Sequence, residues 1–186
     1  MKVIDNFLSK SYFKEVSSFI ESENFNWYYI KNIGVYYKDK ENLDREFGFS
    51  HAFINENGEV TSQLANFLKP MFLNILDLTN KEKILRARAV MTNNVGKSVL
   101  YEKHVDIYRP HTAAIFYINE SDGDTILYNQ KIFTKEEFDN KKNDYPILKK
   151  ISPKPNRLLV FNGTTLHSSV SPTKNNARII INSNYE

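Results

Sequence analysis

The side chains best able to do chemistry in this chain are histidines and carboxylates, because cysteine is absent. Without cysteine, a disulfide scaffold, a cysteine zinc site and a cysteine nucleophile are excluded, so any metal must take His, Asp or Glu ligands. The chain has only four histidines, at positions 51, 104, 111 and 167. His104 and Asp106 form an H-x-D triplet, and residues two apart on a strand project from the same face. The two side chains could therefore bind one ion.

An H-x-D triplet is weak evidence alone, so its context matters. His167 follows an apolar run, and a turn through Gly163 could return the chain to the same end of a β-barrel. Two imidazoles and one carboxylate form a facial triad, which leaves three adjacent positions on an octahedral Fe(II) for an organic cosubstrate and oxygen. Arg178 opens the last predicted strand, and its guanidinium could pair with a carboxylate in the barrel mouth.

Two helices are predicted before residue 80. Over residues 9–23 the apolar positions Phe13, Val16, Phe19 and Ile20 follow a helical period, and Ser9 or Ser11 could cap the segment. A second apolar stripe runs over residues 61–76, where Pro70 should kink or divide the helix. We expect the two helices to pack together as a support layer.

After residue 80 the chain reads as short strands rich in Ile, Val, Tyr and Phe, separated by Gly, Asn, Pro and Ser. The predicted strands are residues 83–91, 99–106, 112–119, 125–128, 157–162, 165–170 and 178–184. Seven short strands predict a closed or sandwich-like β structure. Thr134 and Glu137 have capping-box spacing, which predicts a short helix ending near Lys142.

The block from Gly96 to Tyr185 resembles the catalytic core of the Fe(II)- and 2-oxoglutarate-dependent dioxygenases. It is most similar to the prolyl-4-hydroxylase-like branch and its small phage-encoded members. The residues that carry the resemblance are Tyr101-Glu-Lys-His104-Val-Asp106, Ile115-Phe-Tyr117-Ile-Asn119, Gly123-Asp-Thr125, Asn156-Arg-Leu-Leu-Val-Phe161, His167 and Arg178-Ile-Ile-Ile-Asn182. Many relatives carry Gly-Gly where this chain has Gly123-Asp124, so we expect a changed turn rather than a lost site.

The resemblance implies a mainly β (α+β) fold, a double-stranded β-helix (jelly-roll, cupin-like barrel) with N-terminal supporting helices. It implies that His104, Asp106 and His167 bind Fe(II), and that Arg178 and the Tyr117 hydroxyl hold the distal carboxylate of 2-oxoglutarate. The implied activity is hydroxylation of a C–H bond by O₂, with oxidative decarboxylation of 2-oxoglutarate to succinate and CO₂. If Tyr117 points into the barrel, strand parity places Ala113 and Ile115 beside it.

The roles of six other residues stay open: Tyr101, His51, His111, Arg86, Arg88 and Asn182. Tyr101 matches a tyrosine near the substrate-facing mouth, and His51 reads as a loop residue. For His111 the alternatives are support of a metal ligand, contact with substrate, or an exposed position. Arg86 and Arg88 could form the polar face of a strand or line a site for an acidic substrate. Asn182 shares the parity of Arg178.

Several function classes remain for the whole chain, which we expect to be one domain over residues 1–186. Residues 1–80 would form the helical and substrate-side segment, and residues 81–186 the barrel core with an insertion at 131–150. The loop-like segments 28–50 and 131–150 should set specificity for a protein side chain or a small metabolite. The alternatives to an oxygenase are a non-enzymatic jelly roll and a cupin-type metalloenzyme that does not use 2-oxoglutarate.

Charge and hydropathy bear on partners and location. A net charge of +3, from 25 basic and 22 acidic residues, is too small and dispersed to indicate a nucleic-acid groove, which argues against a nucleic-acid demethylase. The longest purely apolar run, Ala113–Ile118, is too short to cross a bilayer, and no signal peptide is evident. We expect a soluble protein without membrane partners, in the cytoplasm or, if viral, in the host cytoplasm.

Overall fold

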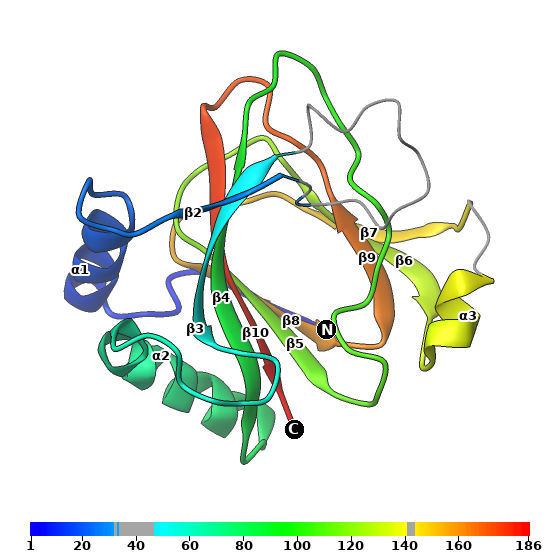
Figure 1. Cartoon of the computed structure of the whole chain (residues 1–186), viewed down its shortest axis with the longest axis horizontal. Coiled ribbons are helices and arrows are strands. Elements are labelled where there is room, and N and C mark those ends of the chain that lie inside the picture. Colours follow the sequence, from blue (N-terminus) through cyan, green and yellow to red (C-terminus); the bar gives the residue numbers. More distant parts are fainter. Residues whose placement is uncertain (32, 34–46, 141–143) are drawn as a thin grey trace.

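Most of the regular structure is β-strand, arranged as two facing sheets (Figure 1). The computed structural model describes residues 1–31, 33, 47–140 and 144–186. In order, the larger sheet consists of β1 (Lys2–Ile4), β8 (Arg157–Asn162), β5 (Thr112–Tyr117), β10 (Ala177–Tyr185), β4 (Ile84–Asn93), β3 (Gly48–Ile54) and β2 (Tyr28–Ile30). The smaller sheet consists of β7 (Ile147–Ile151), β6 (Thr125–Lys131) and β9 (Thr165–Ser169). The described pairs are antiparallel, and the predicted double-stranded β-helix is confirmed.

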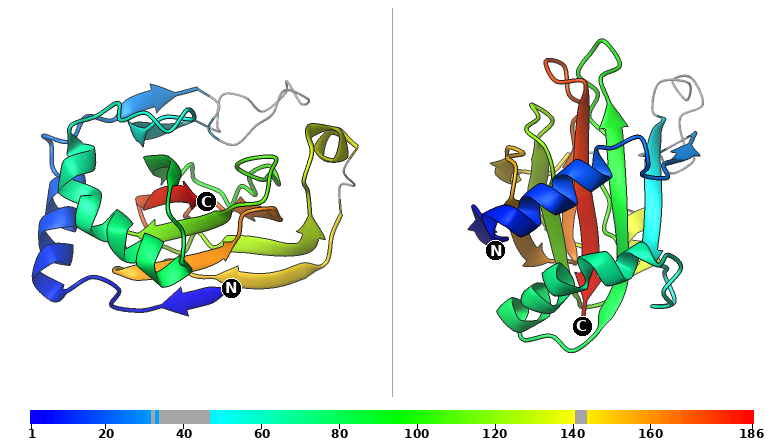
Figure 2. Two further views of the ribbon diagram at one scale, coloured as in Figure 1. Left: turned by 90° about the horizontal axis from the view of Figure 1, so that it is seen from below. Right: turned by 90° about the vertical axis from the view of Figure 1, so that its left-hand side faces the viewer.

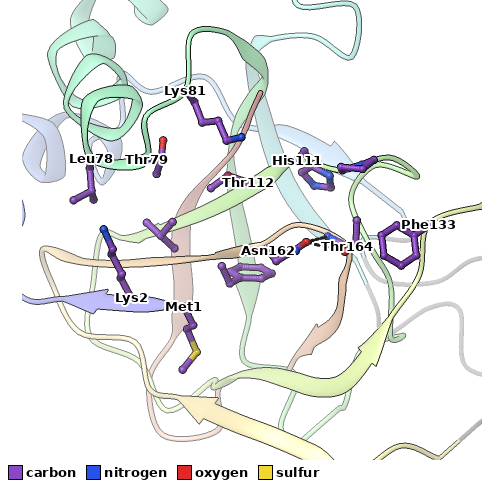
Figure 3. Close-up of a pocket in the computed structure, with 13 residues that line it drawn as sticks. Met1, Lys2, Leu78, Thr79, Lys81, His111, Thr112, Phe133, Asn162 and Thr164 are labelled. Atoms are coloured by element: carbon purple, nitrogen blue, oxygen red, sulfur yellow. Dashed lines mark hydrogen bonds between the residues drawn. The ribbon is translucent and has the colours of Figure 1, made fainter.

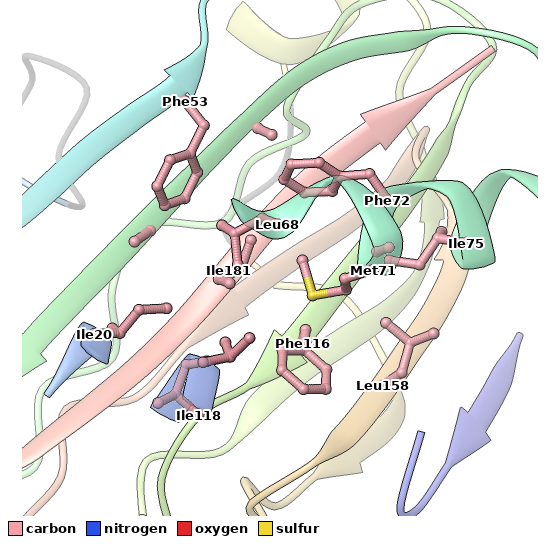
Figure 4. Close-up of a cluster of buried hydrophobic side chains, with 14 of the residues drawn as sticks. Ile20, Phe53, Leu68, Met71, Phe72, Ile75, Phe116, Ile118, Leu158 and Ile181 are labelled. Carbon is pink, nitrogen blue, oxygen red and sulfur yellow. The ribbon is translucent and has the colours of Figure 1, made fainter. Parts of the chain in front are cut away.

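The two predicted N-terminal helices are present as α1 (Lys10–Ile20) and α2 (Leu64–Thr79). Both cover the outer face of the larger sheet, as Figure 2 shows from two sides. Of the two candidate caps, Ser9 is the N-cap of α1, and its hydroxyl accepts a hydrogen bond from the Tyr12 amide. Between the helices and the sheet lies the main apolar core (Figure 4), whose labelled members include Ile20, Leu68, Met71, Phe72, Ile75, Phe116, Ile118 and Ile181. The support layer is therefore confirmed.

Pro70 lies inside α2 and does not divide it, so that part of the expectation is wrong. Pro70 cannot donate to the carbonyl of Asn66, one turn earlier. Both residues are exposed, so water can satisfy that carbonyl, while the neighbouring Leu68 and Met71 are buried against the sheet. Apolar packing thus keeps the helix continuous. No described helix is both long enough and apolar enough to span a membrane.

Six of the seven predicted strands are present, as β4, β5, β6, β8, β9 and β10. The prediction for residues 99–106 is wrong: this segment makes only isolated bridges, Leu100 with Val170 and His104 with His167. Its backbone meets β9 at Tyr101 and again at His104, but no continuous ladder joins the two points. Regular alternation therefore does not place His104 and Asp106 on one strand face.

Four strands, β1, β2, β3 and β7, were not predicted. Two of them have three residues each, and β7 is exposed along most of its length, so none of these three shows the apolar alternation of a buried strand. The segments 28–50 and 131–150 are thus only partly loops: the first contains β2 and the start of β3, and the second contains β7 and α3 (Lys135–Asp139). Residues 32, 34–46 and 141–143 lie outside the described part of both segments. The α3 helix begins with the predicted capping box but ends at Asp139, before Lys142.

The barrel interior carries a second apolar cluster, formed by side chains on the other face of the larger sheet and by the smaller sheet. It contains Ala113, Ile115, Tyr117, Leu127, Ile151, Leu159, Phe161 and Ile180. The predicted inward parity of Ala113, Ile115 and Tyr117 is therefore confirmed. Two of these apolar side chains, Ile115 and Ile180, line the same cavity as the polar groups of the candidate site.

Candidate metal centre and cavity

The three predicted metal ligands lie together in the structure. Among the described residues, His104, Asp106 and His167 form a group whose potential ligand atoms all lie within 4.8 Å of one another. The backbones of the two histidines pair reciprocally, with N···O distances of 2.8 and 2.9 Å. This pairing sets the imidazole centroids 4.5 Å apart. The two histidine side chains are therefore brought together by a local backbone bridge between residues 104 and 167, rather than by a regular strand.

Both imidazoles present Nε2 to the centre of this group. Nδ1 of His104 lies 3.0 Å from the Glu102 carbonyl oxygen, and Nδ1 of His167 lies 3.0 Å from that of Thr165. A carbonyl can only accept, so in the neutral imidazole Nδ1 carries the proton and Nε2 has the lone pair that a metal needs. Burial, with the neighbouring His104, lowers the pKa of His167 to about 4. His167 is therefore neutral near pH 7, as a metal ligand must be.

Two observations test whether a divalent cation fits here. Nε2 of His167 is buried and has no hydrogen-bond partner in the described part of the chain, and it lies 3.9 Å from Oδ2 of Asp106. A buried acceptor facing a buried carboxylate is costly unless a cation lies between them. Burial alone would raise the pKa of Asp106, but Arg86 and the two imidazoles hold it well below its usual value. The donor set fits a facial-triad metal such as Fe(II).

Asp106 is also held by residues that sequence reasoning did not assign. Its Oδ1 accepts a hydrogen bond from Nη2 of Arg86 at 2.8 Å, and its Oδ2 accepts from the amides of Asn182 and Asn184 at 3.2 and 3.0 Å. Arg86 is 7% exposed. Arg86 thus lies on a polar face of a strand, one of the two expected alternatives, and that face of β4 points into the barrel rather than to solvent. Strand parity, extended to the β4–β10 register of Arg86 with Asn184, is the signal that could have found this group.

A cavity of about 70 Å³ lies beside the triad. Its lining residues include His104, His167, Arg178, Arg88, Val90, Thr92, Tyr101, Ile115, Thr125, Ile180 and Asn182. The sequence-predicted residues His104, His167, Arg178 and Tyr101 are thus brought to one space. Apolar side chains form part of its wall, while buried polar atoms of Thr92, His167 and Asn182 lack partners among the described residues. Such a cavity suits a small molecule that carries polar groups.

Arg178 supplies a buried positive charge to this cavity. It is 2% exposed, and it donates from Nε to the Gly123 carbonyl at 2.9 Å and from Nη2 to the Thr125 hydroxyl at 2.7 Å. Within the described ranges, these hydrogen bonds go to a carbonyl and a hydroxyl, not to a carboxylate. Because a buried cation is stable only with a counter-charge, Arg178 fits an anionic ligand end. The Gly123-Asp124-Thr125 turn thus supports Arg178 directly.

Tyr117 lies behind this cavity rather than on its wall. Its hydroxyl is 2.7 Å from Oγ1 of Thr125, its ring packs 5.7 Å from the Arg178 guanidinium carbon, and its side chain is fully buried. Thr125 lines the cavity and contacts both Tyr117 and Arg178, so it is a site residue that sequence reasoning missed. Direct contact between the Tyr117 hydroxyl and a cosubstrate stays a prediction.

The other two histidines lie outside the group of possible metal ligands found among the described residues. His111 is buried, and its ring lies so close to Gly163 that no Cβ would fit at position 163. Gly163 also donates its amide to the His111 carbonyl at 2.8 Å, so the exposed alternative for His111 is wrong and the residue supports the turn before His167. His51 lies on β3 rather than in a loop, with Nδ1 2.7 Å from the Asn26 carbonyl and Nε2 2.9 Å from the Ser62 hydroxyl.

A larger cavity, about 440 Å³, lies near the ends of β8 and α2 (Figure 3). Lys2, Lys81 and His111 line it, and Figure 3 marks hydrogen bonding from Thr164 to the Asn162 side chain. None of the three triad residues borders it. The chemistry of the smaller cavity, rather than the size of the larger one, therefore marks the candidate site.

The fold and the triad together define a double-stranded β-helix with a candidate non-haem metal centre. No model of a known protein family matches the chain, and no curated protein matches it. Solved structures do match. A prolyl hydroxylase from Trichoplax adhaerens, in complex with a hypoxia inducible factor peptide fragment, is 17% identical with a TM-score of 0.64, covering 99% of this chain and 82% of that one.

Two further structures extend this comparison. A 2OG-Fe(II) oxygenase family oxidoreductase from Burkholderia pseudomallei is 8% identical with a TM-score of 0.67, covering 99% of this chain and 84% of that one. The viral collagen prolyl hydroxylase of Paramecium Bursaria Chlorella virus-1, in its 2OG complex, is 16% identical with a TM-score of 0.54, covering 99% and 93%. At these identities the likeness shows the fold: the chain has the fold of the 2OG-Fe(II) oxygenases.

Proposed function

We propose that this protein is an Fe(II)- and 2-oxoglutarate-dependent oxygenase that hydroxylates a C–H bond. One observation carries the proposal: two Nε2 lone pairs and a buried carboxylate converge beside a cavity that also meets the buried guanidinium of Arg178. The metal end and the cation end match the two ends of a dicarboxylate that chelates a metal. The 2-oxoglutarate bound by the viral hydroxylase of the same fold supports the choice of cosubstrate.

In this proposal each residue has a defined task. His104, Asp106 and His167 would hold Fe(II), and Arg178 would bind the distal carboxylate of 2-oxoglutarate. Thr125 fixes Arg178 through its hydroxyl, and Ile115 lines the cavity with Ile180 and excludes water. When bound, Fe(II) and 2-oxoglutarate would activate O₂, which is the oxidant: one of its oxygen atoms would go to succinate as 2-oxoglutarate loses CO₂, and the other would hydroxylate the C–H bond.

Spectroscopy under anaerobic conditions tests the proposal. Adding Fe(II) and 2-oxoglutarate to the wild type should give the weak visible charge-transfer absorption of a chelated complex. The absorption should vanish in His104→Ala and persist in His51→Ala, which removes a buried histidine outside the site. If the wild type binds neither metal nor 2-oxoglutarate, the proposal is wrong. Metal binding without succinate formation in air would instead indicate a metalloenzyme that does not use 2-oxoglutarate.

A further inference from the structure

The carboxylate of Asp106 is held on both oxygens before any metal is considered. Arg86 donates to Oδ1 at 2.8 Å, and the amides of Asn182 and Asn184 donate to Oδ2. The Arg86 and Asp106 side chains are 9% and 1% exposed, so this is a buried ion pair. Nη1 of Arg86 also contacts the exposed Glu56 carboxylate at 3.3 Å.

The two oxygens of Asp106 face different neighbours. Oδ2 is the oxygen that lies 3.9 Å from Nε2 of His167, while Oδ1 is the oxygen paired with Arg86. We infer that Arg86 is a positioning residue that keeps Asp106 a one-oxygen metal ligand, an inference that rests on the proposed function. The guanidinium holds Oδ1, whereas Oδ2, which faces His167, would bind the metal in place of one of its two amide contacts from Asn182 and Asn184.

The number of metal positions explains why this matters. A triad with a one-oxygen carboxylate leaves three positions on a six-coordinate metal, and a chelating cosubstrate with O₂ uses all three. A carboxylate bound through both oxygens would take one of these positions. Arg86 therefore preserves the position that the cosubstrate or O₂ needs.

Charge neutralisation alone does not account for Arg86. A buried ion pair has a large desolvation cost, and a divalent metal bound to Asp106 would neutralise the carboxylate without help. Arg86 instead orients the Asp106 carboxylate. Its planar guanidinium on β4 binds one oxygen, while the amides on β10 bind the other. Such outer contacts are a common means of orienting metal ligands.

The test uses Co(II) as the metal and N-oxalylglycine as an inert analogue of 2-oxoglutarate. Visible absorption reports Co(II) binding and coordination, and titration of the loaded protein reports analogue affinity. Arg86→Gln should bind Co(II) with an altered spectrum, and its affinity for the analogue should fall about tenfold or more. The control Arg109→Gln removes an exposed arginine, paired with Glu186, and should match the wild type in both readouts.

The outcomes separate the two proposals. If Co(II)-loaded wild type does not bind the analogue, the proposed function fails. If the wild type binds it and Arg86→Gln has the same spectrum and analogue affinity, the positioning role is overturned. Loss of Co(II) binding by a folded Arg86→Gln protein would also overturn it, because Arg86 would then be needed for ligation itself.

A second variant covers the case in which Arg86→Gln does not fold. Arg86→Lys keeps the positive charge but replaces the planar fork by a single ammonium. It should shift the Co(II) spectrum and weaken analogue binding in the same direction, by less than Arg86→Gln. Wild-type behaviour in both readouts would overturn the positioning role.

Discussion

The two faces of strands β4 and β10 are both buried, but by different means. On the outer face Ala87, Ala89, Ile179 and Ile181 pack under the helices in the main apolar core. On the inner face, the same two strands carry arginines and asparagines: Arg86, Arg88, Arg178, Asn182 and Asn184. Apolar burial stabilises the fold, whereas burial of charged groups has a cost that only a function or a counter-charge explains. The contrast within two strands therefore separates scaffold from site.

The largest effect is expected from removing a large side chain from the main apolar core, which lies on the outer face of the larger sheet. Phe116 is 1% exposed, and its ring meets those of Phe7 and Phe13 at 6.2 and 6.0 Å. Phe116→Ala should lower the free energy of unfolding by about 3–5 kcal/mol through lost burial and a residual cavity. Urea denaturation measures this change, and the control Phe133→Ala, at a 43% exposed position, should change stability by about 0.5 kcal/mol or less.

The comparison also requires that Phe116→Ala leave the inner face intact. The folded fraction of this variant should bind Fe(II) and 2-oxoglutarate as the wild type does. A loss of 2-oxoglutarate affinity in protein shown to be folded would contradict the separation of the two faces.

The next effect comes from removing the buried cation of the inner face. Arg178→Ala should weaken 2-oxoglutarate binding about 100-fold, since truncating one partner of a buried charge pair costs roughly 2–5 kcal/mol. Fe(II) affinity should change little, because Arg178 does not contact the triad in the hydrogen bonds described. Titration of the visible absorption with 2-oxoglutarate measures the first effect and metal titration the second. Equal loss of both would show that Arg178 is structural.

A smaller effect should follow from changing the hydroxyl that fixes this cation. Thr125→Val keeps the side-chain shape but removes the partner of Arg178 Nη2 and of the Tyr117 hydroxyl. The affinity for 2-oxoglutarate should fall about tenfold, corresponding to about 1.4 kcal/mol for a lost buried hydrogen bond. Tyr117→Phe should have a smaller effect if Tyr117 acts through Thr125. A larger effect for Tyr117→Phe than for Thr125→Val would instead support direct contact between Tyr117 and the cosubstrate.

The sequence predicted the candidate ligands and Arg178 but not the residues that hold Asp106, and the reason is physical. The H-x-D motif, and the positions of His167 and Arg178 in the ordered block after it, predicted His104, Asp106, His167 and Arg178 as candidate site residues. The partners of Asp106 are brought to it by pairing of β4 with β10: Arg86 is 20 residues away, and Asn182 and Asn184 are 76 and 78 residues away. Spacing along the chain carries no information about such contacts until the register is known.

The same limit applies to the fold. Short runs rich in Ile, Val, Tyr and Phe predicted six of the observed strands, and helical periodicity predicted α1 and α2. The three-residue strands β1 and β2 and the exposed β7 form because neighbouring strands offer a hydrogen-bonding edge, and this cause is absent from their own sequences. Residues 99–106 show the converse, since they read as a strand but pair only at isolated points along β9.

The smallest effect is expected at Asp122, in the connection between β5 and β6. The Asp122 carboxylate accepts hydrogen bonds from the amides of Thr173, Lys174 and Asn175, and from the Thr173 hydroxyl. These contacts, with the Thr173 hydroxyl bond first, lower the pKa of Asp122. Because the group is exposed to solvent, Asp122→Asn should cost less than about 1 kcal/mol of stability near pH 7.

The pH dependence of this effect has a definite sign. A carboxyl whose pKa is lowered by folding stabilises the protein fully above its unfolded pKa of about 4, and this contribution is lost as the pH falls through the folded value. The stability difference between wild type and Asp122→Asn, measured by urea denaturation at a series of pH values, should therefore shrink on acidification. The control Asp139→Asn changes an exposed aspartate at the end of α3 and should show a smaller difference near pH 7. A difference for Asp122→Asn that grows as the pH falls would mean that the ionised carboxylate does not hold the turn at Asp122. The neighbouring Gly123 carbonyl would then be held in contact with Arg178 by the barrel strands alone.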